Sequence, residues 1–225
     1  VFEDCTSLES IIIPPTTMSI GYKAFCGCKS LKSISFPEDM AEIGSFAFEG
    51  CISLYSIKIP SNIKVGTGVF NHCNKKLQID SDFLTCKEGG FVTTNDNILI
   101  SYLGNDTNII IPNSVTQIWG DIFRDCQLIQ SIIIPRGIKK IGARMFCGCS
   151  SLRSIHIPNT VTDIGESAFS DCVSLKMIDL PDSLSKIGNM AFYNCTALHA
   201  VEIPDSIEEI GFAAFENCTS LKTAV

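Results

Sequence analysis

The sequence has few of the side chains that most catalytic or nucleic-acid-binding sites require. Its 225 residues include three histidines and one tryptophan, and 24 aspartates and glutamates outnumber 17 lysines and arginines. The net charge of −7 argues against binding to a phosphate backbone, which needs clustered basic side chains. No nucleic-acid partner is therefore expected.

Long apolar runs and helical periodicity are also missing. No apolar run approaches the roughly 18 residues that a membrane-spanning helix needs. No stretch of eight or more residues repeats its apolar side chains with a period of 3.6, so no long helix is expected. The chain is nevertheless 45% hydrophobic and only 18% charged, which argues against disorder.

The sequence contains no constellation of residues that points to chemistry. His72, His156 and His199 fall in different segments, and no nucleophile, base and orienting acid converge. Cys26-Gly-Cys28 and Cys147-Gly-Cys149 look like metal-binding pairs, but they lie five repeats apart. No glycine-rich phosphate loop follows a predicted strand. We expect no enzyme activity, metal, cofactor or small-molecule substrate.

The chain has an internal repeat of 23 residues. Three kinds of residue recur at this step in one register: a proline, a phenylalanine and a cysteine. The prolines are Pro14, Pro37 and Pro60, then Pro112, Pro135, Pro158, Pro181 and Pro204. The phenylalanines are Phe2, Phe25 and Phe48, then Phe123, Phe146, Phe169, Phe192 and Phe215. The cysteines are Cys5, Cys28 and Cys51, then Cys126, Cys149, Cys172, Cys195 and Cys218. A period of this length is typical of a solenoid, in which each turn buries its apolar side chains against its neighbours.

One repeat reads L-x-x-I-x-I-P-x-x-V-x-x-I-G-x-x-A-F-x-x-C-x-x. Alternation in the I-x-I step predicts a short strand with one buried face, and the proline ends it because proline lacks the N–H that a sheet needs. The glycine of the I-G step indicates positive φ or a tight bend. The phenylalanine is expected to fill the core. We predict one short strand per turn, paired in parallel with the strands of neighbouring turns about 4.8 Å away.

The I-P step, the I-G-x-x-A-F step and the cysteine three residues after phenylalanine resemble the BspA-type, or Treponema-type, leucine-rich repeat. The resemblance covers essentially the whole chain and implies a right-handed leucine-rich repeat solenoid. Members of this family are mostly surface or secreted proteins of bacteria and mucosal protist parasites, and several are linked to adhesion. The resemblance therefore implies a cell-surface or secreted location.

We expect residues 1–225 to form a single solenoid that is a fragment of a longer chain, since the sequence starts and ends within a repeat. Solenoids usually carry polar capping repeats, so uncapped ends allow self-association. The repeat is interrupted at about 79–109. Two β-rich runs there, Gly89–Thr94 and Ile98–Leu103, flank Asn95-Asp96-Asn97, which predicts an inserted β-hairpin near the middle of the chain.

Twelve cysteines in a small secreted chain would suggest disulfides, but nine of them, including Cys73, share one repeat position. Stacked neighbours would have their Cβ atoms about 4.8 Å apart, which is longer than the 3.5–4.5 Å or so that a disulfide prefers. We therefore predict a buried ladder of reduced thiols, with a disulfide framework as the alternative.

Two repeat positions are predicted to face outward from the strands, and they supply the candidate protein-binding surface. Its residues are Lys58, Ile110, Ile133, His156, Asp179, Glu202, Ser131 and Ser154. Apolar side chains followed by charged ones are typical of an interaction face, although they also occur as scattered surface residues.

These observations predict a non-catalytic protein-interaction module. It is interpreted as part of a cell-surface adhesin or antigen that binds host or matrix proteins. The alternative is an intracellular (cytoplasmic) leucine-rich repeat scaffold, which unpaired cysteines would suit. A third possibility is that this segment is only a spacer.

Overall fold

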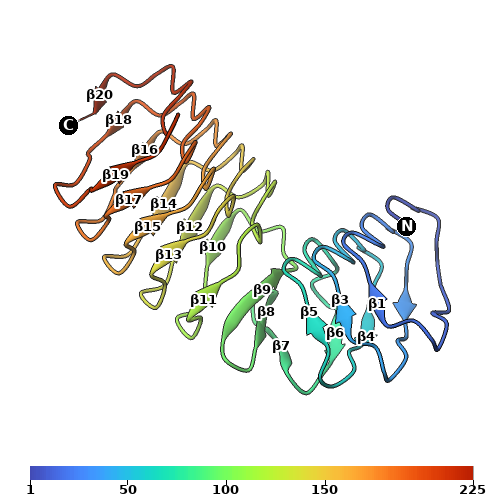
Figure 1. Ribbon diagram of the computed structural model, residues 1–225. Helices are drawn as coiled ribbons and strands as arrows, with labels where there is room; N and C mark the ends of the chain where they lie inside the picture. The colour runs from blue at the N-terminus through green and yellow to red at the C-terminus, as the bar shows by residue number, and fades with distance from the viewer. Residues whose placement is uncertain (225) are drawn as a thin grey trace. The chain divides into compact units, whose positions relative to one another are not determined.

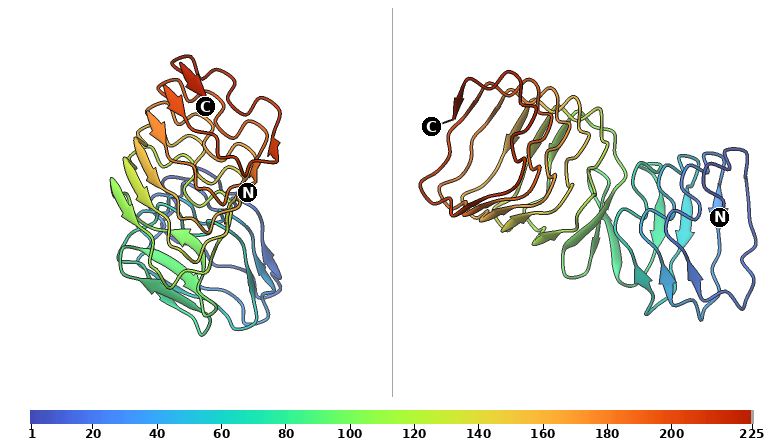
Figure 2. Two further views of the ribbon diagram at one scale, coloured as in Figure 1. Left: turned by 90° about the vertical axis from the view of Figure 1, so that its left-hand side faces the viewer. Right: turned by 45° about the horizontal axis from the view of Figure 1, so that its top comes forward.

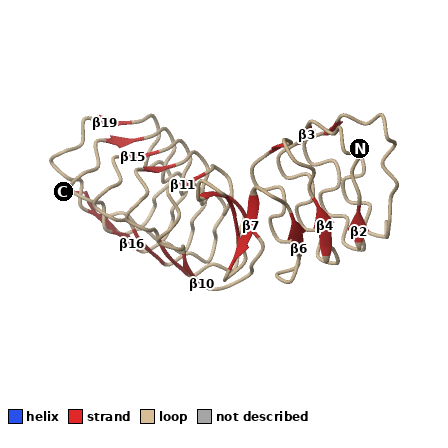
Figure 3. Cartoon of the chain, turned by 90° about the horizontal axis from the view of Figure 1, so that it is seen from below, coloured by secondary structure: helices blue, strands red, loops and turns tan. Residues whose placement is uncertain are grey.

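The computed structural model describes residues 1–224, in which the chain forms strands, turns and loops and no helix (Figure 3). It contains two compact units, one from Val1 to Gly104 and one that begins at Asn105. In each unit successive repeats stack as turns of a solenoid (Figures 1 and 2). The predicted solenoid with parallel sheets and no helices is confirmed. Whether the two units act as a single solenoid remains a prediction.

Most turns carry the predicted strand at the I-x-I step, and these are called the I-x-I strands. In the first turn only Ser10 forms a bridge, with Ser33. In the first unit they are β2 (Ser33–Ile34), β4 (Ser56–Lys58) and β6 (Gln78–Asp80). In the second unit they are β10 (Asn108–Ile110), β12 (Ser131–Ile133), β14 (Ser154–His156), β16 (Met177–Ile178), β18 (Ala200–Val201) and β20 (Thr223–Ala224). They pair in parallel with a shift of one repeat, as Ile132 with Ile155 illustrates. The first isoleucine of the I-x-I step in β2, β4, β10, β12, β14 and β16, and Val201 of β18, point into the core.

The structure adds a second strand to most turns, which the expectation of one strand per turn missed. These strands of two residues end at the isoleucine or valine before the I-G glycine and are called the I-G strands. In the first unit they are β1 (Ser19–Ile20), β3 (Glu42–Ile43) and β5 (Lys64–Val65). In the second unit they are β11 (Gln117–Ile118), β13 (Lys140–Ile141), β15 (Asp163–Ile164), β17 (Lys186–Ile187) and β19 (Glu209–Ile210). Strands β1, β3 and β5 pair in parallel, and so do β13, β15, β17 and β19, as Ile164 with Ile187 shows. Strand β11 is not part of either of these two sheets.

The core is built from columns of identical side chains. Phe169 is fully buried, and its ring stacks on Phe146 and Phe192 with centroid distances of 5.3 and 5.2 Å. The same stacking continues from Phe2 through Phe25 and Phe48 to Phe70 in the first unit. Aromatic contacts of this kind add to the free energy that burial of the rings contributes. The phenylalanine position therefore fills the core, as predicted.

The cysteines recur beside the phenylalanines because their small thiol groups donate hydrogen bonds between neighbouring turns. Seven thiols donate to the carbonyl oxygen of the phenylalanine one repeat earlier, with Sγ–O distances between 3.0 and 3.2 Å. They belong to Cys28, Cys51, Cys73, Cys149, Cys172, Cys195 and Cys218. All twelve cysteines are free, and Cys5 is the one member of the column whose side chain is exposed. The cysteines therefore form the predicted buried column, and their thiols link neighbouring turns.

The insertion is a three-stranded antiparallel sheet in the first unit. The predicted hairpin is confirmed as β8 (Phe91–Thr94) and β9 (Ile98–Tyr102), and a further strand, β7 (Leu84–Lys87), pairs with β8. In the regular turns, backbone N–H groups near the phenylalanine donate to carbonyl groups of the following repeat. Here strand β9 supplies the acceptor instead, since the Gly68 N–H donates to the Ile100 carbonyl at 2.7 Å. The insertion therefore takes the place of one turn of the stack.

Of the two roles predicted for the glycines of the I-G step, positive φ is wrong. None of them has positive φ. That conformation falls on other positions, such as Ser167 and Asp171. A Cβ at Gly165 would lie 2.6 Å from the backbone nitrogen of Ala143 and 2.8 Å from the carbonyl carbon of Gly142. The absence of a side chain lets the backbones of neighbouring turns approach each other.

This geometry predicts opposite results for two alanine substitutions at the same repeat position. Gly165→Ala forces two backbones apart, and we expect it to destabilise the protein by about 1–3 kcal/mol, as overpacking does. Gly21→Ala is the matched control, because a Cβ at Gly21 meets nothing within 4 Å. It should be neutral or slightly stabilising. Urea unfolding measures both, and equal destabilisation would contradict the close-approach explanation.

Candidate binding surfaces

The I-x-I strands of the second unit present two columns of outward side chains. Strands β10, β12 and β14 place Ile110 beside Ile133, and Ile133 beside His156. The other column contains Ser131 and Ser154. The alternation of the pleat leaves these residues at the surface, with Ile110 68% and Ile133 44% exposed. Two apolar side chains on adjacent strands are therefore in contact with solvent.

Acidic residues continue the column in the next turns. Asp179 directly follows β16 and Glu202 directly follows β18, two strands that pair in parallel. Both side chains are exposed. Seven of the eight predicted residues thus lie on, or directly after, I-x-I strands of the second unit, and we call this surface the I-x-I face.

Lys58 is the exception, since it lies on β4 in the first unit. There it faces Asp80 of the neighbouring strand β6 in the same register. Both side chains are exposed. The repeat register placed Lys58 in the correct outward column, but in the other compact unit from the remaining seven residues.

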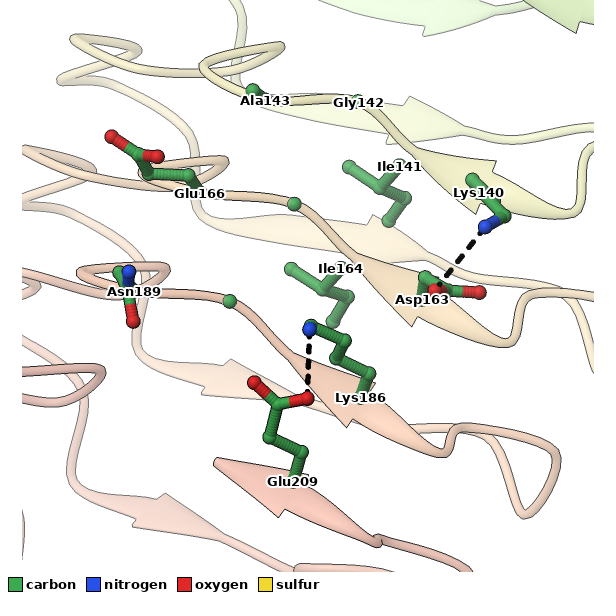
Figure 4. A pocket seen from close by; sticks show the side chains of 12 residues that line it. Lys140, Ile141, Gly142, Ala143, Asp163, Ile164, Glu166, Lys186, Asn189 and Glu209 are labelled. Atoms are coloured by element: carbon green, nitrogen blue, oxygen red, sulfur yellow. Dashed lines mark hydrogen bonds and ion pairs between the residues drawn. The ribbon is translucent and has the colours of Figure 1, made fainter. Parts of the chain in front are cut away.

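A second surface, which the sequence analysis did not identify, lies over the I-G strands of the second unit (Figure 4). It is an open trough of about 390 Å³ whose lining includes Gly142, Gly165 and Gly188. Charges of alternating sign line one side, where Lys140 contacts Asp163 at 3.4 Å and Lys186 contacts Glu209 at 2.7 Å. A column of glycines beside a column of alternating charge was the signal that would have revealed it.

Four of the five charged side chains that line the trough are paired with one another, and Glu166 is the fifth. Thr162 Oγ1 donates to Asp163 Oδ2 at 2.6 Å, and this hydrogen bond, together with Lys140, lowers the pKa of the Asp163 carboxyl. Exposed ion pairs contribute little to stability, but they neutralise the surface that carries them. No histidine or cysteine lines the trough. It is therefore a weaker candidate for binding than the I-x-I face.

Residues 1–224 form neither a metal-binding cluster nor a membrane-spanning helix. Within this range no three histidine, cysteine, aspartate or glutamate side chains gather in a way that would hold a metal ion. The same residues include no helix long and apolar enough to cross a membrane.

Comparison with known proteins gives consistent results at the levels of sequence and structure. A model of the BspA type leucine rich repeat region matches residues 1–128 and 93–222, with six copies. No curated protein matches the chain.

Several solved structures share the fold. A leucine rich cell surface protein from Faecalibacterium prausnitzii A2-165 is 31% identical with a TM-score of 0.79, and the match covers 99% of this chain and 61% of that one. A leucine-rich repeat protein from Bacteroides ovatus is 30% identical with a TM-score of 0.51, covering 99% and 74% of the two chains. The pneumococcal vaccine antigen PcpA, at 21% identity and a TM-score of 0.72 over 96% and 56%, shows the fold alone. The chain thus spans about three fifths of the Faecalibacterium protein.

Proposed function

The chain belongs to the family of proteins with a BspA-type leucine-rich repeat region, and from this premise we propose that it is a non-catalytic protein-interaction module of a cell-surface adhesin or antigen. Its partner in this proposal is a host or matrix protein. The observation that carries the proposal is the I-x-I face, where Ile110 and Ile133 expose apolar surface next to His156, Asp179 and Glu202.

Two lines of support come from the fold. Leucine-rich repeat solenoids typically act as interaction scaffolds, because stacked short strands present a continuous surface. The Faecalibacterium protein, 31% identical over nearly the whole chain, is described as a cell surface protein. Exposed isoleucines on a rigid sheet suit protein binding, since apolar side chains at the centre of an interface carry much of its free energy.

An intracellular scaffold is the second candidate, and the free cysteines favour it. Disulfides are rare in reducing compartments, and none of the twelve cysteines is bridged. The thiol ladder also fits an extracellular protein, because its thiols are buried and already donate to carbonyl groups. Fractionation of the cells that produce the full-length protein separates the two: recovery from the surface or medium supports the adhesin, and recovery only from the cytosol contradicts it.

The role of the I-x-I face predicts the effect of removing its two isoleucines. The double variant Ile110→Ser, Ile133→Ser puts at both sites the residue that Ser35 already supplies at this repeat position. In a binding screen against purified matrix and host-surface proteins, we expect the wild-type chain to bind at least one of them. The variant should bind that protein about tenfold or more weakly.

A matched control comes from Leu128 and Val173, which are 57% and 37% exposed and lie outside the I-x-I strands. Serine occupies both of these repeat positions as well, at Ser151 and Ser150. Leu128→Ser, Val173→Ser should retain the binding of the wild type. Equal loss in both double variants, or full binding by the Ile110 and Ile133 variant, would contradict the assignment of the face.

A further inference from the structure

A column of basic side chains runs beside the I-x-I face of the second unit. It occupies the residue after the repeat leucine, immediately before the outward serine column. Its members are Arg153, Lys176, His199 and Lys222. All four side chains are exposed. We call this column the basic stripe.

Backbone hydrogen bonds hold three members of the stripe, Lys176, His199 and Lys222, in register. The Lys222 N–H donates to the His199 carbonyl at 3.1 Å, and the His199 N–H donates to the Lys176 carbonyl at 3.2 Å. Arg153 lies one repeat earlier, and its N–H donates to the Gln130 carbonyl at 2.8 Å. Successive side chains therefore start about 4.8 Å apart, the spacing of neighbouring strands.

Within residues 1–224 no acidic side chain forms an ion pair with Arg153, Lys176 or Lys222. Asp179 follows Lys176 by three residues, a distance of about 10 Å along an extended chain. At physiological ionic strength that is about one Debye length, so the acidic column does little to neutralise the stripe.

The same repeat position in the first unit is neutralised within the protein. There Glu9 precedes Lys32 by one repeat, and Lys32 Nζ contacts Glu9 Oε2 at 2.7 Å. This contact lowers the pKa of the Glu9 carboxyl through its hydrogen bond and charge. The I-G strands likewise alternate Lys140, Asp163, Lys186 and Glu209. The basic stripe instead places the like charges Arg153 and Lys176 in neighbouring turns, with Lys222 two turns further on, an arrangement that is destabilising unless anions lie against it.

We propose that the basic stripe binds an acidic, extended segment of a protein partner that lies across the strands. The proposal rests on the proposed function, because it assigns the chemistry of the partner that the I-x-I face contacts. Charge complementarity selects carboxylates as the groups that bind the stripe, even though this protein has a net charge of −7 overall. Met177, which directly follows Lys176 and is exposed, favours a polypeptide over a sulfated polysaccharide, since its side chain offers an apolar contact beside the stripe.

The test uses fluorescently labelled poly-L-glutamate of about 15 residues, measured by fluorescence anisotropy against the full chain. A poly-L-glutamine peptide of the same length is the neutral probe, and heparin is the sulfated one. We expect poly-L-glutamate to bind more tightly than the other two, with an affinity that falls as salt rises. A triple variant of the stripe should weaken this binding about tenfold; it combines Arg153→Gln, Lys176→Gln and Lys222→Gln.

The control is Lys29→Gln, Arg136→Gln, Lys139→Gln, which removes the same number of positive charges from exposed sites outside the stripe. It should change the affinity by less than about twofold. Equal weakening in both triple variants, no weakening in the stripe variant, or stripe-dependent binding of heparin alone would overturn the proposal. The proposed function fails separately, when the Ile110 and Ile133 variant keeps its binding in the protein screen.

Discussion

Raising the pH from 8 to 11 is expected to unfold the protein cooperatively. Burial raises the pKa of the Cys51 thiol to about 12 and that of the Cys149 thiol to about 12. It holds the pKa values of Cys73 and Cys172 well above the ordinary range. Deprotonation would remove the thiol's hydrogen bond to a phenylalanine carbonyl and leave a charge in an apolar core.

The direction of the effect follows from the protons bound in each state. An unfolded cysteine has a pKa of about 8.5, so above that pH the folded state binds more protons than the unfolded state. The stabilising contribution is complete below pH 8.5 or so and is lost as the pH rises toward 12. Each such thiol removes about 1.4 kcal/mol of stability per pH unit within this window. Four of them exhaust a typical stability of about 5–15 kcal/mol within roughly one to three pH units.

The measurement is the free energy of unfolding from urea titrations at several pH values between 8 and 11. Cys172→Ala should lower the slope of this free energy against pH by about 1.4 kcal/mol per unit, because one buried thiol no longer titrates. Cys5→Ala is the control, since the Cys5 side chain is exposed. A slope that Cys172→Ala leaves unchanged would show that the ladder thiols do not govern alkaline unfolding.

Phe169→Ala is expected to destabilise the protein by about 3–5 kcal/mol. The Phe169 ring is fully buried between Phe146 and Phe192, and the turns on both sides prevent the cavity from closing. In a chain of this length the melting temperature should fall by roughly 10 °C. Differential scanning calorimetry measures the change.

Phe212→Ala is the matched control for this prediction, because the Phe212 side chain is 79% exposed. Its free energy of unfolding should change by no more than about 0.5 kcal/mol. If the Phe169→Ala variant melts at the wild-type temperature, Phe169 does not lie in the core, and the stacked phenylalanine column is contradicted.

The repeat made most of the fold predictable. Columns such as Phe146, Phe169 and Phe192 can stack only if the 23-residue turns lie in register, so the sequence alone predicted the solenoid and its core. The I-G strands were not predicted, because a strand of two residues, such as Asp163–Ile164, is too short to show alternating apolar and polar side chains. The role of Gly165 was misread for a related reason: close approach between turns depends on the neighbouring backbone, which sequence spacing does not reveal.

The candidate binding face was predictable wherever the register was unbroken. Ile110, Ile133 and His156 share one column because their strands pair with a shift of one repeat. Lys58 obeys the same register but lies before the insertion, in the other compact unit. The basic stripe was missed because Lys176 and its equivalents precede the strands and look like variable surface residues. Its significance emerges only when the ion pairs of other columns are compared with it.

Partner binding at the I-x-I face is the central claim to test. The decisive measurement is an isoleucine-methyl NMR titration of the chain with the protein that binds in the screen. The methyl signals of Ile110 and Ile133 should shift or broaden on binding. Those of Ile52, which is 53% exposed but lies outside the strands, should stay unchanged. Perturbation of Ile52 with no change at Ile110 and Ile133 would place the binding surface elsewhere and contradict the account.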